Sequence, residues 1–470
     1  MKFRLLCFFG VLCIFFLDAF NVLNTEEKPK ENGAASAVEF KKILPKIDLK
    51  DGETLIFLGD SITYQCLYTQ YVETYFYTRY PDRRIHFRNA GVGGDRAKHS
   101  LARFEDDVAS FDPDYVTVLL GMNDASYDRF EFEHFADYQR DMNTIMGLIE
   151  ESGAKGILLH PTMFDARASR IQGRTWEPVA TYYNGVLALY GAWLREVATR
   201  RGLGFVDMYS PMNNLTADQR KVDPTFTMIP DSVHPAPTGQ VVMAVAMLDD
   251  LFVRSSLNSI SINSRPGGER VLAAVNGEVT DIVDEGPEGK IQFNFMAKAL
   301  PWVLPPEAAE GYKLTKAGHR YSGERFAARG LKPGRYKLQI DGQVVGQYES
   351  NRLARGIELQ ENKKTPQYQQ AQKVALLNQK RNQEAVKALR EWWLNLRRQE
   401  RDLGKIIDAF GEDSKAAKEK AEEKRIFEKE KFPRGIAETT ATAKTMEDEI
   451  YRINQPIKRQ YELIPIRGKK

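Results

Sequence analysis

The chain has 470 residues, which is more than one hydrophobic core usually accommodates, so we expect two or three domains. Hydrophobic residues make up 42% of the sequence, enough for a sizeable core. The 67 Lys and Arg residues nearly balance 64 Asp and Glu residues, and no basic stripe with interleaved aromatic residues occurs, which argues against a nucleic-acid-binding protein.

Residues 1–23 have the pattern of an export signal. Two basic residues precede an apolar run from Leu5 to Leu17, which is too short to span a bilayer comfortably. No small-x-small cleavage site follows it, so an uncleaved membrane anchor stays open as the alternative. We expect a secreted or periplasmic protein, or one attached to the membrane by this segment. Cys66 is the only cysteine beyond it, which excludes a disulfide framework.

Residues 24–49 are polar and predict a flexible leader. Over residues 50–255 short apolar strands alternate with amphipathic helices, and this pattern predicts a mostly parallel sheet covered on both faces. The expected strands are Thr54–Leu58, Ile85–Asn89, Tyr115–Leu120, Gly156–His160 and Gly204–Val206. Five strand–helix units favour a three-layer α/β/α, flavodoxin-like domain with strand order 2-1-3-4-5.

Residues 256–362 have a different pattern, with short strands separated by turn signals such as Pro333-Gly334 and Asp341-Gly342. They predict a small antiparallel accessory β module. Residues 363–470 are charged and helical in pattern, with an apolar stripe that includes Val374, Leu389 and Trp393.

A Gly-Asp-Ser-Ile-Thr sequence at residues 59–63 follows the first expected strand. A serine at such a strand-to-helix turn can present its hydroxyl at the sheet edge, and its own N–H lies near a helix N-terminus. Asp and Ser are also favoured N-cap residues, so the motif alone also fits an ordinary helix start.

Two further loops follow the second and third strands. The first contains Gly91, Gly93 and Gly94, and glycines let backbone N–H groups approach a ligand closely. The second is Gly-Met-Asn-Asp at residues 121–124, where Asn123 can direct its side-chain amide at an oxyanion. Each sequence is also common in plain turns.

The fourth loop, Asp-Ser-Val-His-Pro at residues 231–235, precedes the last helix of the domain. A nucleophilic serine needs a neutral imidazole to accept its proton, and the imidazole needs a partner that fixes its tautomer. One compact loop can carry both, as His234 and Asp231. The Asp-x-x-His spacing has little weight by itself, but all four loops lie at strand-to-helix junctions, where ligands bind in open α/β sheets.

This set of four loops resembles the SGNH (GDSL) hydrolase family over roughly residues 50–255. The resemblance implies Ser61 as nucleophile, His234 as general base and acid, Asp231 as its orienting partner, and an oxyanion hole of the Ser61 N–H, the Gly94 N–H and the Asn123 amide. Gly91 and Gly93 are close enough to compete with Gly94 for its role. The resemblance implies neither a cofactor nor a metal ion.

The sequence thus predicts an exported serine esterase that uses an acyl-enzyme mechanism on a small ester or an acylated carbohydrate, with deacetylation of carbohydrate preferred. A lysophospholipase or thioesterase is one alternative. The other is a cell-surface binding or scaffold protein in which the hydrolase fold is secondary, because the charged helical region takes up about a quarter of the chain.

Overall fold

The structure, a computed structural model, describes residues 41–171, 179–264, 269–286 and 288–466. The expected signal or anchor (residues 1–23) and most of the expected leader lie outside these ranges. Among the helices within them, none combines the length and the apolar character needed to cross a membrane.

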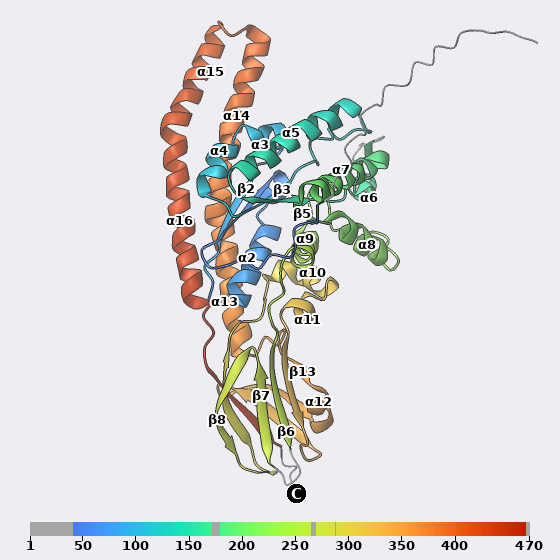
Figure 1. The fold of residues 1–470 in the computed structure, drawn as a ribbon, viewed down its shortest axis with the longest axis vertical. Coiled ribbons are helices and arrows are strands. Elements are labelled where there is room, and N and C mark those ends of the chain that lie inside the picture. The colour runs from blue at the N-terminus through green and yellow to red at the C-terminus, as the bar shows by residue number, and fades with distance from the viewer. Residues whose placement is uncertain (1–40, 172–178, 265–268, 287, 467–470) are drawn as a thin grey trace, which may run out of the picture. The chain divides into compact units, whose positions relative to one another are not determined.

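The centre of the α/β domain is a five-stranded sheet in which all strands run parallel (Figure 1). Its order is β2-β1-β3-β4-β5, which confirms the predicted order 2-1-3-4-5. The strands are β1 (Thr54–Gly59), β2 (His86–Gly91), β3 (Tyr115–Leu119), β4 (Lys155–Leu159) and β5 (Gly204–Val206). All residues of β3 are buried, as in strands covered on both faces.

Helices cover this sheet and connect its strands. They are α1 (Ser61–Tyr64), α2 (Tyr68–Arg79), α3 (Ala97–Leu101), α4 (Phe104–Asp107), η1 (Ala109–Phe111), α5 (Phe132–Glu151), α6 (Ala166–Ile171), α7 (Val179–Arg201), α8 (Tyr209–Gln219) and α9 (Pro237–Asp250). Helix α2 packs against α9, and α3 packs against α5. Every residue of α2 is buried, so other parts of the chain cover the sides that the sheet and α9 leave open.

Two further sheets follow α9 and share a second hydrophobic core. Their orders are β13-β10-β6-β7 and β12-β11-β14-β9-β8. The strands are β6 (Asn258–Ser264), β7 (Arg270–Val275), β8 (Gly277–Asp284), β9 (Ile291–Ala297), β10 (Glu324–Arg329), β11 (Arg335–Ile340), β12 (Gln343–Glu349), β13 (Ile357–Glu358) and β14 (Arg459–Pro465). Short helical segments between them are η2 (Pro306–Ala308), α10 (Ala309–Leu314), α11 (Ala317–Tyr321) and α12 (Ser350–Arg355).

The pairing of these strands differs from the expected antiparallel arrangement at one place, because β10 pairs with β6 in parallel. The long crossover that a parallel pair requires is supplied by the intervening chain with α10 and α11. The sequence also did not indicate β14, from the end of the chain, which inserts between β9 and β11 in antiparallel register. The module is therefore completed by residues far outside 256–362.

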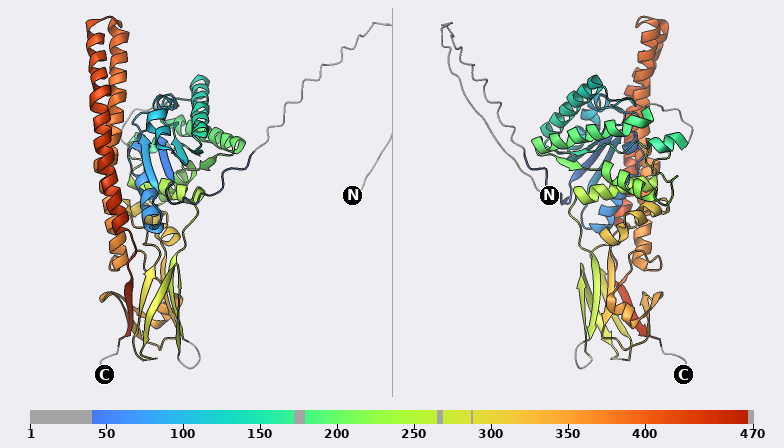
Figure 2. Two further views of the ribbon diagram at one scale, coloured as in Figure 1. Left: turned by 60° about the vertical axis from the view of Figure 1, so that its left-hand side comes forward. Right: turned by 90° about the vertical axis from the view of Figure 1, so that its right-hand side faces the viewer.

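The helical region forms a long hairpin that packs along the edge of the α/β domain. One arm consists of α13 (Pro366–Arg381), the π-helical segment η3 (Asn382–Val386) and α14 (Lys387–Phe410), and the other of α15 (Lys415–Ile426), the π-helical segment η4 (Phe427–Lys431) and α16 (Phe432–Ile453). Helices α14 and α16 run side by side, as the left view of Figure 2 shows. Helix α13 contacts α2, and α14 contacts β2, so this tail hairpin covers part of the α/β domain.

Leu463 of β14 tests whether the end of the chain stabilises the β module. Its side chain is 1% exposed and lies in the second core. We expect Leu463→Ala to lower the free energy of unfolding of this module by about 2–5 kcal/mol in urea, through lost burial and the cavity left behind. Gln460→Ala, an exposed position on the same strand, is the control and should change it by less than about 0.5 kcal/mol. Equal effects of both substitutions would contradict the role of β14.

Candidate active site

Ser61 begins α1 directly after β1, at the carboxyl end of the central sheet. Asp60 is the N-cap of this short helix, and its Oδ1 accepts a hydrogen bond from the Ile62 N–H at 2.9 Å. The turn is tight, because a Cβ at Gly59 would lie 2.2 Å from Thr63 Oγ1. Chain geometry therefore holds the Ser61 hydroxyl at the edge where the parallel strands end.

His234 lies between Ser61 and Asp231. Its Nε2 is 2.8 Å from Ser61 Oγ, and its Nδ1 is 2.7 Å from Asp231 Oδ2. The other carboxylate oxygen of Asp231 accepts hydrogen bonds from the backbone N–H of Val233 at 3.0 Å and of His234 at 2.7 Å. Asp231 thus fixes both the loop and the imidazole ring. A neutral ring that donates from Nδ1 to this carboxylate has its lone pair on Nε2, facing the serine.

The hydrogen bonds of this loop shift the pKa of both partners. Burial opposes ionisation of Asp231, but hydrogen bonds from the His234 side chain and from two backbone N–H groups outweigh it and lower the pKa to about 2. The same side-chain hydrogen bond raises the pKa of His234 above its ordinary value, against the opposing effect of burial. At neutral pH the carboxylate is ionised, and the imidazole is a stronger base than it would be without it.

The three glycines of the second loop differ in what their backbone groups do. The Gly91 N–H donates to Asn89 Oδ1 at 2.9 Å, and a Cβ on Gly91 would lie 2.3 Å from the Tyr64 nitrogen, so this glycine serves close packing. Within the described part of the chain, the N–H groups of Gly93 and Gly94 have no acceptor. Gly94 has a φ of +75°, a conformation that favours glycine. Gly93 and Gly94 thus stay as candidate donors, and Gly91 does not.

Asn123 reaches the same loop from the end of β3. Its Nδ2 donates to the carbonyl oxygen of Asp95 at 2.9 Å, and its Oδ1 accepts a hydrogen bond from the Tyr127 hydroxyl at 2.9 Å. These two contacts fix the amide orientation, and the Nδ2 group has a second hydrogen to donate. The neighbouring Asp124 accepts from the backbone N–H of Ala97 at 2.8 Å and so ties the loop after β3 to α3.

One side chain at this site comes from a region that the sequence did not connect with it. Arg397 of α14 donates to the carbonyl oxygens of Gly93 and Gly94, which precede it by 304 and 303 residues. No local pattern in the sequence signals a contact over such a separation. Arg397 lies in a strongly charged segment, where an exposed helix face is the usual expectation.

His160 has a packing role. It is 8% exposed, its ring stacks on Tyr209 with centroids 4.8 Å apart, and its Nδ1 lies 2.9 Å from the Pro161 carbonyl oxygen. Throughout the described ranges, no three His, Cys, Asp or Glu side chains are grouped so as to hold a metal ion.

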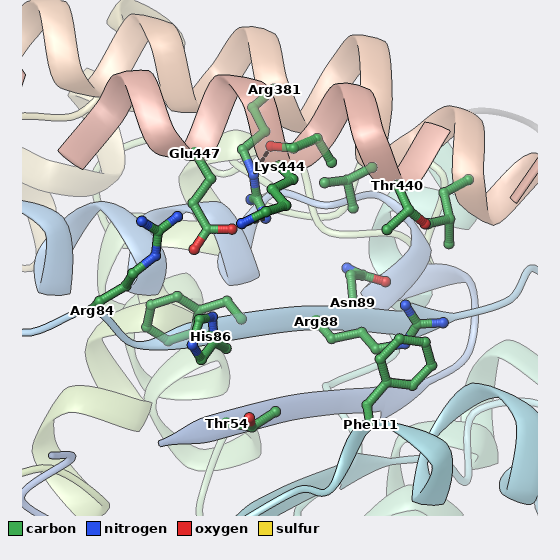
Figure 3. A pocket seen from close by; sticks show the side chains of 14 residues that line it. Thr54, Arg84, His86, Arg88, Asn89, Phe111, Arg381, Thr440, Lys444 and Glu447 are labelled. Carbon is green, nitrogen blue, oxygen red and sulfur yellow. Dashed lines mark hydrogen bonds and ion pairs between the residues drawn. The ribbon is translucent and has the colours of Figure 1, made fainter. Parts of the chain in front are cut away.

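A cavity of about 300 Å³ lies between β2 and the tail hairpin (Figure 3). Arg84, His86 and Arg88 line it from the side of β2, and Lys444 and Glu447 line it from α16. None of the residues that line it belongs to the Ser61, His234 and Asp231 set, so this cavity is separate from the site that contains Ser61.

Comparison with known proteins gives three findings. Residues 57–242 match the model of the GDSL-like lipase/acylhydrolase family. The chain is 26% identical over 221 residues to an acetylxylan esterase of Geobacillus stearothermophilus, covering 43% of this chain and 94% of that protein. It is also similar to the solved structure of a gut microbial diltiazem-metabolizing enzyme, with a TM-score of 0.74, 26% sequence identity, and coverage of 91% of this chain and 100% of the other.

Proposed function

We propose that this member of the SGNH (GDSL-type) hydrolase family, a serine hydrolase that acts on ester bonds, forms its acyl-enzyme intermediate on Ser61. The observation that carries the proposal is the unbroken hydrogen-bonded chain from Ser61 Oγ through His234 to Asp231. A serine hydroxyl is a weak nucleophile by itself, and an adjacent oriented base activates it.

In the proposed reaction, His234 Nε2 takes the proton of Ser61 while Oγ attacks the ester carbonyl carbon. The imidazolium, stabilised by the Asp231 carboxylate, then gives this proton to the oxygen of the leaving alcohol, and the acyl group stays on Ser61. A water molecule, deprotonated by His234, attacks the acyl-enzyme, and the serine leaves with the proton as the acid is released. Each step uses only groups of this chain, the substrate and water.

The negative oxygen of the tetrahedral intermediates needs hydrogen-bond donors that are in place beforehand. We assign this role to the Ser61 N–H, the Gly94 N–H and the Asn123 amide. Support comes from the carboxyl-end placement of all three, from the unengaged Gly94 N–H among the described residues, and from the hydrogen bonds that fix the Asn123 amide.

As substrate we propose an acetylated carbohydrate, and as location the outside of the cytoplasmic membrane. The support is the similarity to an acetylxylan esterase over nearly its whole length, together with the expected export signal. The complete hydrogen-bonded set favours catalysis over a binding or scaffold role, since a purely structural fold has no use for an oriented Ser–His–Asp chain.

The first test is hydrolysis of 4-nitrophenyl acetate by the full chain and by Ser61→Ala. Loss of the nucleophile should lower kcat at least about 10³-fold, since nucleophile removal in serine hydrolases costs that much or more. Ser210→Ala, at an exposed position of α8, is the control and should keep the rate of the unchanged protein. Equal rates for Ser61→Ala and the unchanged protein would refute the assignment.

The pH dependence tests the roles of His234 and Asp231. Only the neutral imidazole accepts the serine proton, so kcat/KM should rise with pH through the raised pKa of His234. Asp231→Asn removes the carboxylate that raises this pKa, so the rising limb should move to lower pH. The plateau should fall by about 10²–10⁴-fold, because the ring loses its tautomer and orientation. An unchanged limb in the variant would contradict the pairing.

The substrate proposal is tested with a panel of acetylated xylo-oligosaccharides, a longer-chain nitrophenyl ester and a lysophospholipid. We expect the highest kcat/KM on the acetylated sugars, measured as released acetate, with Ser61→Ala as the blank. Preference for the lysophospholipid or for the longer acyl chain would replace carbohydrate deacetylation with a lipolytic function, while leaving the mechanism intact.

A further inference from the structure

Helix α14 of the tail hairpin reaches the glycine loop of the site through Arg397. We propose that Arg397 is a positioning residue that holds the Gly93–Gly94 peptide in the orientation the oxyanion hole requires. The inference rests on the proposed function, and it makes the tail part of the esterase site.

The Arg397 guanidinium contacts four residues in and just after the glycine loop. Its Nη1 donates to the Gly93 carbonyl oxygen at 3.0 Å and its Nη2 to the Gly94 carbonyl oxygen at 2.7 Å. Its Nη1 also donates to Asp95 Oδ1, and its Nη2 lies 3.0 Å from His99 Nδ1. The planar fork of an arginine can hold two carbonyl oxygens at once, which a lysine ammonium does less well.

These contacts with the Gly93 and Gly94 carbonyl oxygens also fix the direction of the Gly94 N–H. A trans peptide unit is planar, so the Gly93 carbonyl and the Gly94 N–H point in opposite directions. Because Arg397 binds the Gly93 oxygen, the Gly94 N–H points away from α14. The next peptide is held as well, since the Asp95 N–H donates to the Val92 carbonyl oxygen at 3.2 Å.

The peptides of this loop need contacts from another part of the chain to fix their orientation, because the loop is rich in glycine. A peptide between two glycines has no side chain to restrict its rotation, and Gly94, at a φ of +75°, lies in a region that glycine enters and leaves freely. Rotation of the Gly93–Gly94 peptide would turn a carbonyl oxygen toward the position of the oxyanion, where it repels negative charge. Arg397 opposes this rotation by its hydrogen bond to the Gly93 carbonyl oxygen, and its hydrogen bond to the Gly94 carbonyl oxygen holds the following peptide.

Helix α14 is itself firmly attached at this place. Arg390, one of the fully buried side chains, donates to the Gly91 carbonyl oxygen at 2.9 Å and forms a two-point ion pair with Asp107. Trp393 and Val92 are buried in one small apolar cluster between the helix and the loop. The guanidinium of Arg397 is therefore presented from a fixed helix.

His99 supports the same arrangement. Burial, together with the Arg397 charge, lowers its pKa to about 4, so the ring is neutral at neutral pH. Its Nδ1 then accepts hydrogen bonds from Arg397 and from the Arg96 N–H, which lies 3.1 Å away. The ring thus limits where the guanidinium can move.

The experiment compares Arg397→Ala, Arg397→Lys and Arg398→Ala in the full chain. Arg398 is the matched control, because it is the next residue on α14 and donates to Asn395 of the same helix. For 4-nitrophenyl acetate we expect Arg397→Ala to lower kcat about 10- to 100-fold with KM within about threefold, since a misplaced donor weakens the transition state more than the bound substrate. Arg397→Lys should recover part of the loss, and Arg398→Ala should match the unchanged protein.

A second readout separates positioning from stability. A thionoester places sulfur where the ester has oxygen, and sulfur accepts weaker hydrogen bonds, so an intact oxyanion hole favours the ester strongly. The ratio of kcat/KM for ester over thionoester should fall in Arg397→Ala and stay unchanged in Arg398→Ala. Melting temperatures are measured alongside, because Arg397→Ala also removes an ion pair of the buried Asp95 carboxylate, which keeps Arg103 as its other partner.

Two results would overturn the inference. One is an Arg397→Ala enzyme with unchanged kcat. The other is a loss of rate at an unchanged ester-to-thionoester ratio, which would mean that Arg397 only stabilises the tail. Failure of the proposed function is distinguishable from both, because in that case Ser61→Ala would keep its activity whatever Arg397 does.

Discussion

A buried carboxylate, Asp107, joins β2 and the start of α4 to the distant tail hairpin, and the geometry of the site depends on it. Arg88 of β2, Arg103 before α4 and Arg390 of the tail all form ion pairs with it, and its side chain has no exposed surface. Burial alone would raise the pKa of Asp107, but the three guanidinium groups outweigh it and lower the pKa to about 2. Removing one partner of such a buried ion pair typically lowers the free energy of unfolding by about 3–5 kcal/mol, because the remaining charge is left buried and unpaired.

Arg103 extends this network to the strand ends near Ser61. Besides Asp107 and Asp95 it donates to two carbonyl oxygens, that of Ala90, the next-to-last residue of β2, at 2.8 Å and that of Gly59, the last residue of β1, at 3.4 Å. The loop with the serine and the loop with the glycines are thus attached to one guanidinium. The acyl transfer proposed above needs its donors and its nucleophile in fixed relative positions before the substrate arrives, and this ion network joins the two loops that carry them.

The sequence was sufficient for the central sheet, because its strands depend on local patterns. Ser61 and His234 lie 173 residues apart, and it was the resemblance of the four loops to the SGNH family that brought them together. Apolar runs between helices indicated all five strands, and the Asp-x-x-His loop is short enough to carry both partners. The sequence was insufficient for strands that are exposed, because these lack an apolar pattern, and for contacts between residues far apart in the chain. Strand β8 is a mostly exposed edge strand without apolar alternation, and β14 acquires its place only through pairing with β9 and β11. Arg397 could not be assigned for the same reason, since its partners lie about 300 residues away.

The tail hairpin also shows why the composition of a charged helix does not reveal whether its charged side chains are exposed or buried. Most charged side chains of α15 are exposed to solvent, as in the ion pair between Arg425 and Glu422. In α13 and α14 three arginines at positions 381, 390 and 397 instead meet buried carboxylates of the α/β domain, Glu73, Asp107 and Asp95. A count of charges does not distinguish these cases, because what differs is the partner and not the residue. A charged helix that places arginines on one face therefore acts here as an attachment surface, and through its last arginine it also acts on the site.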